Sequence, residues 1–338
     1  MADFLKILSG DELAQISVQF DYTDATKDFV GLKLFPMVKT DNLKVAMYNL
    51  VKGAKIPVIA LVHAFDAEAR IGDRPDYEVF REQLFLIKEK INQGEELRKK
   101  IRDMGMSENE SAVINALYDD IANEITKVLT AFERRACEAL STAKLVINEN
   151  GAVKTVDYGL AASNKIDFTG WNVTSHDIIA DIAALKVASK DKIVRMIVSS
   201  KIMGYMLANQ KLNSFAVAQL QPMTAGYVKN YISNALGIEV VVDDRTYRTS
   251  YQDATEYRFF DEDTVISLTT RGEVGKTFMT TTPPEDAGKT DRTYGFVAVH
   301  QWVSDDPYTS WTKAEGVGMP VFTDINNTLF LSVITATL

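Results

Sequence analysis

The sequence predicts an α+β fold, in which helices and strands mostly occupy separate stretches of the chain. A stretch at 107–141 has helical periodicity and contains neither Gly nor Pro. An Asn-Gly pair at 150–151 separates two β-prone runs. Residues 171–305 first alternate helical and strand-like segments and then continue as strands and long loops. The 338 residues suffice for one large domain or two smaller ones.

The composition is that of a folded protein with an acidic surface. Hydrophobic residues make up 46% and charged residues 25% of the chain, and the net charge is −9. Proteins that bind nucleic acid usually carry a basic surplus, so this charge disfavours that class. Cys137 is the single cysteine, which excludes an intrachain disulfide and fits folding in a reducing cytosol. No apolar run approaches the roughly 20 residues of a membrane helix, and we expect no signal peptide and no membrane association.

Residues 1–55 are predicted to form an N-terminal arm. A short apolar run near the start suits a short helix. Residues 34–43 are expected to be extended, because Pro36 disfavours a helical conformation in the residue before it. Nothing in residues 1–50 predicts a compact core.

Residues 56–105 are predicted to form an extended loop. Strand-like runs at 57–65 and 85–91 flank a polar segment with Gly72 and Pro75, which predicts a long hairpin. Connections of this length are usually functional. Charged side chains of both signs lie in or beside the polar segment: Asp66, Glu68, Arg70, Asp73, Arg74 and Arg81.

The helix predicted at 107–141 is the strongest local signal in the chain. Ser107 and Glu110 have the spacing of a capping box. Apolar residues then recur at steps of three and four: Ile114, Leu117, Ile121, Ile125, Val128 and Phe132. At 1.5 Å per residue the helix would be on the order of 50 Å long. With one apolar face, it is expected to act as a spine against which other elements pack.

The segment at 143–168 is predicted to be strands. Asn150-Gly151 is the dipeptide preferred in two-residue hairpin turns, because both positions need a positive φ. We therefore expect a tight antiparallel hairpin directly after the long helix.

Residues 171–310 are predicted to form a separate mixed domain. Predicted helices span 175–188, 201–210 and 224–236, and predicted strands span 192–200, 238–242, 264–268 and 295–303. Ser175 is placed to cap the first helix, and Gly237 to end the last. Residues 311–338 end in an apolar, β-branched run that predicts a buried strand, which we expect to return to the domain of the long helix.

The sequence RGEVGKT at 271–277 is the main sign of an enzyme. A phosphate-binding P-loop requires Gly, four residues, and then Gly-Lys-Ser/Thr. Gly275, Lys276 and Thr277 supply the second half, but Thr270 stands where the first glycine is required. A glycine-containing loop between strands is the favoured interpretation, and a nucleotide-binding enzyme remains the alternative.

The sequence shows no other catalytic or metal-binding pattern. Asp243 and Asp244 follow a strand-like run, and a turn explains them better than a metal site does. His63, His176 and His300 have no ligand spacing, and neither HExxH nor GxSxG occurs. We therefore predict no catalytic residues, no metal and no cofactor.

Several segments in order resemble the major capsid protein family typified by the lambda phage head protein. They are LFPMVKT at 34–40, PVIALVHAFDAEARIGDRP at 57–75, EALSTAKLVINENGAVKTVDYGL at 138–160, YRFFDEDTVISL at 257–268 and DPYTSWTKAEGVGMPVF at 306–322. The resemblance extends from about residue 30 to the end of the chain. It depends on the set and its order, because no single segment is diagnostic.

The resemblance implies the Hong Kong 97 capsid fold and a structural, non-enzymatic role in an icosahedral shell that encloses phage DNA. The implied parts are an arm (1–55), an extended loop (56–105), a peripheral domain with the spine helix (106–170), an axial domain (171–310), and a strand that returns to the peripheral domain (311–338). The six charged residues of the extended loop, from Asp66 to Arg81, are the predicted contacts between subunits.

The resemblance also implies partners. We expect other copies of the chain in hexamers and pentamers, a separate scaffolding protein, a portal and a decoration protein, together with packaged DNA bound without sequence specificity. The expected location is the virion, with assembly in the host cytoplasm. The alternatives to a shell subunit are a P-loop-like enzyme and another virion protein, such as a tail tube or decoration protein.

Deletion of residues 68–80 tests the role of the extended loop. We expect a folded subunit that cannot form closed shells, because the loop would no longer reach neighbouring copies. Circular dichroism checks folding, and electron microscopy checks assembly. Shells of normal appearance from the deletion variant would contradict the predicted role.

Overall fold

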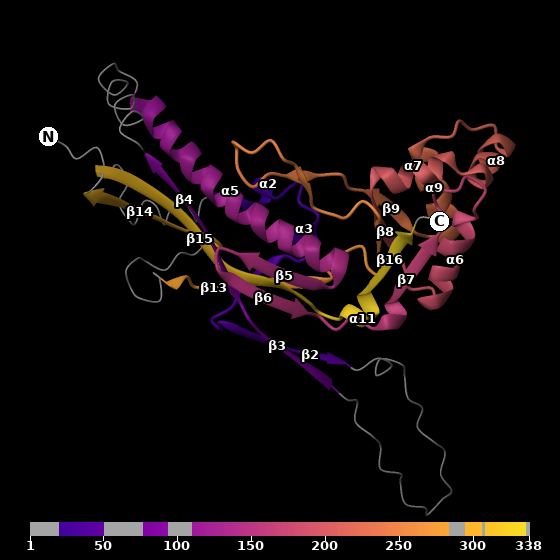
Figure 1. Ribbon diagram of the computed structural model, residues 1–338, viewed down its shortest axis with the longest axis horizontal. Coiled ribbons are helices and arrows are strands. Elements are labelled where there is room, and N and C mark those ends of the chain that lie inside the picture. The colour runs from indigo at the N-terminus through magenta and orange to yellow at the C-terminus, as the bar shows by residue number, and fades with distance from the viewer. Residues whose placement is uncertain (1–19, 51–76, 94–109, 284–294, 306–307, 336–338) are drawn as a thin grey trace, which may run out of the picture. The chain divides into compact units, whose positions relative to one another are not determined.

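The computed structural model shows a mixed helix and sheet protein, which confirms the predicted fold class (Figure 1). It describes residues 20–50, 77–93, 110–283, 295–305 and 308–335. The chain divides into two compact units, each assembled from three separate segments. Unit 1 comprises Met1–Lys44, Gln83–Cys137 and Gly275–Val321. Unit 2 comprises Val45–Glu82, Glu138–Val274 and Phe322–Leu338.

Unit 1 is built on a long helix and a five-stranded sheet. The helix is α5 (Glu110–Thr142), and the strands are β1 (Met37–Lys39), β4 (Phe85–Gln93), β13 (Gly275–Thr280), β14 (Ala298–Asp305) and β15 (Tyr308–Phe322). The strand order is β1-β13-β15-β14, and β4 also pairs with the long strand β15. Val128, Leu129 and Phe132 of α5 form a buried core with Val299 and Ala314 of the sheet.

The predicted spine helix is α5, whose described part begins at Glu110 because residues 107–109 lie outside the described residues. Its apolar stripe is fully buried at Ile121, Ile125 and Phe132, as a one-sided helix against a sheet requires. The helix ends at Thr142, and Ala143 follows with a left-handed φ of 56°. This conformation stops the helical hydrogen-bond pattern and begins the next strand.

The N-terminal segment contributes to the core of unit 1. It forms two short helices, α2 (Tyr22–Ala25) and α3 (Gly31–Leu34), before β1. Leu32, Leu34 and Phe35 are buried. The expectation that this segment takes no part in a compact core is therefore wrong for these residues, because the apolar side chains are too few to form a core of their own but pack on α5 and its sheet.

Glu133 of α5 fixes this segment. Its carboxylate is fully buried and accepts hydrogen bonds from the backbone N–H groups of Val30, Gly31 and Leu32, at 2.9, 2.9 and 2.7 Å. Gly31 lies so close to α5 that an added Cβ would come within 2.8 Å of the Cβ of Ala136. The contact therefore requires both a carboxylate on α5 and a residue without a side chain opposite it.

The strands around the predicted loop are described only in part. Strand 57–65 lies outside the described residues, so the predicted hairpin with 85–91 stays a prediction. The run at 85–91 belongs to β4, which pairs antiparallel with the long strand β15. The strands β2 (Lys44–Leu50) and β3 (Tyr77–Gln83) pair with each other. The pairing of β4 with β15 was not predicted from the sequence.

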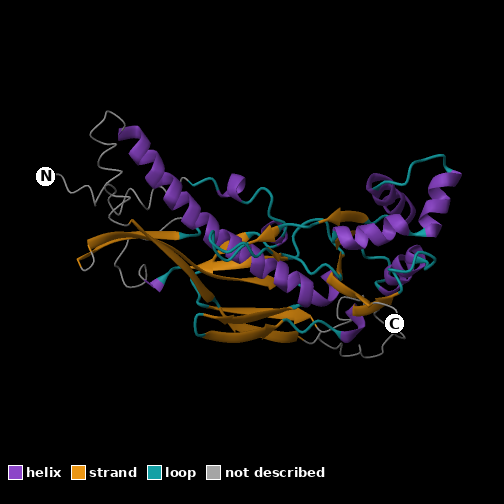
Figure 2. Ribbon diagram, turned by 45° about the horizontal axis from the view of Figure 1, so that its top comes forward, coloured by secondary structure: helices purple, strands orange, loops and turns teal. Residues whose placement is uncertain are grey.

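Unit 2 contains a second five-stranded sheet, with the order β7-β16-β12-β8-β9. The strands are β7 (Lys165–Thr169), β8 (Arg195–Val198), β9 (Glu239–Val242), β12 (Thr264–Leu268) and β16 (Leu329–Thr335). Figure 2 shows helices beside this sheet: α6 (Ile178–Ala188), α7 (Ser200–Ala208), α8 (Gln210–Ala218) and α9 (Ala225–Leu236). A single apolar cluster joins the helices to the strands.

The C-terminal strand β16 is buried, as its composition predicts, but it lies in a different sheet from the one expected. It pairs antiparallel with β12 and parallel with β7. The sequence placed all of 311–338 with the long helix, whereas the chain passes from unit 1 to unit 2 at Phe322. Residues 329–334 complete the sheet of unit 2, since without β16 strands β7 and β12 would both lose a partner.

The predicted turn and helix signals can be compared with the structure directly. Strands β5 (Lys144–Glu149) and β6 (Ala152–Asp157) form the expected hairpin, with φ of 49° at Asn150 and 81° at Gly151. Helix α9 ends at Gly237 in a left-handed conformation, as predicted, and Thr224, the first residue of the predicted helix, is its N-cap. The predicted cap of α6 is wrong: Asp177, not Ser175, accepts the hydrogen bond from Ala180.

Three short elements complete the described fold. They are the β10–β11 hairpin (Thr246–Tyr247 and Tyr257–Arg258) and the four-residue helix α11 (Ile325–Thr328), which directly precedes β16. Within the described residues, no helix is both long enough and apolar enough to cross a membrane.

Replacing Glu133 with Gln tests the anchor between α5 and the N-terminal segment. In glutamine, an NH₂ group replaces one of the two carboxylate oxygens. This group cannot accept a hydrogen bond, so at least one of the three backbone N–H groups loses its acceptor. We expect amide exchange at residues 30–32 to accelerate about tenfold to a hundredfold, because a buried donor without a partner costs roughly 1–3 kcal/mol. Hydrogen-exchange mass spectrometry measures this rate. Glu273→Gln, at an exposed position, is the control; equal exchange in both variants would disprove the anchor.

Candidate functional site

Most of the predicted contact residues cannot be placed. Asp66, Glu68, Arg70, Asp73 and Arg74 lie outside the described residues. Arg81 lies in β3 and is exposed. Their role in contacts between subunits therefore stays a prediction.

The P-loop-like sequence forms a strand. Gly275, Lys276 and Thr277 begin β13 and pair with neighbouring strands, so no phosphate-binding loop leads into a helix here. Thr277 is buried and donates to the carbonyl oxygen of Phe35 at 2.9 Å. A Cβ on Gly275 would come within 2.2 Å of the carbonyl oxygen of Val321. The glycine and threonine thus serve strand packing, and the geometry disfavours the nucleotide-binding alternative.

Asp243 and Asp244 hold a loop in place. Asp243 is buried and accepts hydrogen bonds from the guanidinium group of Arg245 at 2.8 and 3.0 Å. Asp244 accepts from the backbone N–H of Ser200 at 3.0 Å and pairs with Arg258. Within the described part of the chain, no group of three His, Cys, Asp or Glu residues could hold a metal ion.

The same loop carries further ion pairs on its exposed side. Lys201 pairs with Glu262 and Asp263 at 2.9 Å each, and these carboxylates raise the pKa of Lys201. Arg248 pairs with Glu256 and lowers the pKa of that carboxyl group. The ion pairs tie residues 243–263 to the start of α7, so this loop has a defined conformation.

The described histidines and the cysteine are structural. His176 lies 2.7 Å from Asp181, which also accepts from the indole of Trp171. His300 is buried and lies 2.9 Å from Glu315 on the neighbouring strand. Cys137 is buried in α5 beside Glu133. His63 lies outside the described residues.

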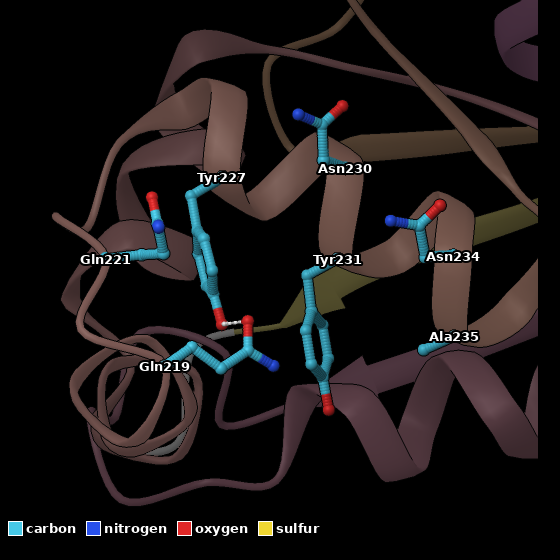
Figure 3. Close-up of a pocket in the computed structure, with 7 residues that line it drawn as sticks. All are labelled: Gln219, Gln221, Tyr227, Asn230, Tyr231, Asn234 and Ala235. Atoms are coloured by element: carbon cyan, nitrogen blue, oxygen red, sulfur yellow. Dashed lines mark hydrogen bonds between the residues drawn. The ribbon is translucent and has the colours of Figure 1, made fainter.

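The α8–α9 groove is an open cavity of about 520 Å³ in unit 2 (Figure 3). Its lining residues are polar or small and carry no charge: Gln219, Gln221, Tyr227, Asn230, Tyr231, Asn234 and Ala235. The hydroxyl of Tyr227 donates to Gln219 at 3.3 Å, and the rings of Tyr227 and Tyr231 stack at 6.1 Å. Phe215 stacks on Tyr231 and supports it from α8.

An apolar knob lies beside the groove. Leu220 stands between two lining residues but is not itself part of the lining. It is 92% exposed and has a left-handed φ of 53°, while Val217, one turn earlier, is 64% exposed. A positive φ at a leucine lowers the stability of the isolated subunit, and burial of the side chain does not compensate here. This surface was not predicted from the sequence, because it depends on how the turn between α8 and α9 folds.

The fold matches those of two solved proteins of phage origin. A prophage protein of Escherichia coli CFT073, assigned as a capsid protein, superposes with a TM-score of 0.64 at 15% identity, covering 97% of this chain and 99% of that one. A phage-related protein of Bordetella bronchiseptica RB50 superposes with a TM-score of 0.55 at 13% identity, covering 95% of each chain. No curated protein matches the sequence. The architecture is the Hong Kong 97 capsid fold.

The family follows from the sequence match. The model of the family described as Phage major capsid protein E matches residues 27–333, and the chain belongs to this family. It is therefore a structural subunit that assembles with copies of itself into the phage shell, and its location is the virion. The resemblance found in the sequence is confirmed, and the proposed P-loop enzyme is not favoured.

Replacing Asp244 with Asn tests the anchoring of loop 243–263. Partial burial opposes ionisation of Asp244, but the hydrogen bonds from Ser200 and Arg258 outweigh it and lower its pKa. Because the folded pKa lies below the unfolded one, ionised Asp244 stabilises unit 2 at neutral pH, and this contribution is lost as pH falls below about 4. We expect Asp244→Asn to lower the free energy of unfolding of unit 2 by roughly 1 kcal/mol at pH 7 and by much less at pH 3.

Unfolding in urea, followed by tryptophan fluorescence, measures this difference. In a Trp302→Phe/Trp311→Phe background the remaining tryptophan is Trp171, which is buried in unit 2, so its fluorescence reports on the unfolding of that unit. Asp167→Asn changes an exposed carboxylate and serves as the control. A loss of stability that is the same at both pH values would contradict the assigned role of the charge.

Proposed function

We propose that the shell subunit contacts its neighbours through the α8–α9 groove, and that the knob of one copy occupies the groove of the next. The observation that carries the proposal is the pairing of an exposed apolar knob with an uncharged, tyrosine-containing cavity beside it. Cores of protein interfaces are depleted of charge and enriched in Tyr, as this lining is.

The arrangement favours a ring of subunits over a simple pair. Knob and groove are different surfaces of one chain, and Leu220 does not fill the groove beside it. A contact between two different surfaces is head-to-tail, and such contacts close into rings when the rotation allows it. The expected pentamers and hexamers can both use this contact, because the rotation between neighbouring subunits differs only slightly between rings of five and six copies.

The domain roles follow from the same proposal. Unit 2, which carries the groove, corresponds to the expected axial domain, and unit 1 with α5 corresponds to the peripheral domain. Residues 56–105 act as the extended loop, with Asp66, Glu68, Arg70, Asp73, Arg74 and Arg81 as charged contacts to neighbouring copies. Exposed single pairs contribute little each, but a closed shell repeats them in every subunit.

The proposed role is non-enzymatic. The place of Thr277 and Gly275 in strand packing, and of Asp243 in loop anchoring, supports it. The expected partners are a separate scaffolding protein, a portal, a decoration protein and DNA bound without sequence specificity. Assembly takes place in the host cytoplasm.

Replacing Leu220 with Asn tests the knob. Asparagine tolerates a left-handed backbone better than leucine, so the isolated subunit should fold at least as well. We expect shells to appear only at higher protein concentration, because burying a leucine contributes roughly 1.5–3 kcal/mol to a contact. Light scattering against concentration measures the threshold, and electron microscopy identifies the particles.

Lys190→Asn is the matched control. Lys190 is also exposed and has a left-handed φ of 55°, so the change gives the same backbone relief without removing an apolar side chain. An unchanged assembly threshold in Leu220→Asn, or an equal change in Lys190→Asn, would disprove the knob contact.

A further inference from the structure

One face of the unit 1 sheet is basic and aromatic. In strands, side chains alternate between the two faces. Ile87, Val299 and Ala314 point to the core under α5. The opposite face of the same three strands (Figure 1) carries what we term the Lys–Trp face: Lys88 and Lys90 of β4, Trp302 of β14, and Trp311 and Lys313 of β15.

The strand register brings these residues together. Trp302 stands directly opposite Trp311, and Lys313 is opposite Lys90. The indole rings stack at 6.2 Å with an angle of 14° between their planes, and the ammonium group of Lys90 lies 4.3 Å from the ring centre of Trp311. Trp302 is nevertheless 40% exposed. A cavity of about 390 Å³ opens beside it, bordered by Lys88, Lys90, Lys313 and also Glu89.

The charges on this face are only partly balanced. Glu315, also on this face, is buried and accepts from Lys313 at 2.8 Å, while His300 occupies its other oxygen at 2.9 Å. Lys88 and Lys90 make no ion pair with any residue that the structure describes. On a chain with a net charge of −9, this face therefore carries two exposed lysines beside a tryptophan that is 40% exposed.

We propose that the Lys–Trp face binds a carboxylate-rich polypeptide segment that also carries an apolar side chain. The lysines provide cations for the carboxylates, and the cavity beside Trp302 accepts the apolar side chain. Duplex DNA would use the lysines but not the indole, because its bases are already stacked on one another. The acidic peptide uses both features, so the observations favour it. This inference is independent of the knob contact proposed above.

The test uses the full chain and a short synthetic peptide of glutamate and leucine. Because Trp171 is buried, a peptide bound at the surface should change mainly the fluorescence of Trp302 and Trp311. We expect the peptide to change this fluorescence, and its affinity to fall with added salt. Lys88→Glu/Lys90→Glu should weaken binding about tenfold or more, because attraction becomes repulsion. Trp302→Ala should also weaken binding, but the affinity should fall with added salt as steeply as it does for the wild-type chain.

Controls separate the possible outcomes. Lys165→Glu/Lys192→Glu makes the same change of charge at exposed positions of unit 2 and should leave binding intact. If the double glutamate variant does not fold, Lys88→Gln/Lys90→Gln replaces it and should still weaken binding. Failure of the wild-type chain to bind the peptide, or equal loss in the unit 2 control, would overturn the proposal. Tighter binding of a short DNA duplex, lost in the same lysine variants, would assign the face to nucleic acid.

Discussion

The burial of one apolar stripe of α5 against the unit 1 sheet is the contact on which the rest of that unit depends. Residues from three distant parts of the chain meet on it, including Leu32, Ile87 and Ala314. The buried carboxylate of Glu133, on the same helix, is stabilised by three backbone N–H groups from the N-terminal segment. The helix therefore fixes both the sheet and the start of the described chain, while Lys88, Lys90 and Trp302 are exposed on the other face of the sheet.

Unit 2 depends in the same way on a strand that is distant in sequence. Strand β16 pairs with β7 and β12, about 165 and 65 residues earlier by the register of Leu331 with Lys165 and Ile266. The sheet cannot be completed before the C-terminal residues are present. Long-range pairings of this kind are slow to form, so each unit gains its full stability only when segments from both ends of the chain have come together.

Local signals in the sequence predicted local structure well. Asn150-Gly151 specified a turn and Gly237 specified the end of α9, because these residue types satisfy a backbone requirement at the position itself. Pairing between distant strands carries no such signal. The pairing of β4 with β15 was therefore not predicted, and the Lys–Trp face, which exists only through this register, could not be found. The α8–α9 groove was missed for a different reason, because it depends on how the turn between α8 and α9 folds.

The placement of charge on the two surfaces follows from what a shell requires. Many copies of an acidic chain repel one another, and each contact between copies has to overcome that repulsion. An uncharged groove that receives an apolar knob adds no like-charge cost, so it suits contacts between identical subunits. A basic patch has the opposite use, because it attracts a partner richer in carboxylates than the chain itself. In the two proposals, Lys88 and Lys90 thus select a partner whose charge differs from that of the shell subunit itself.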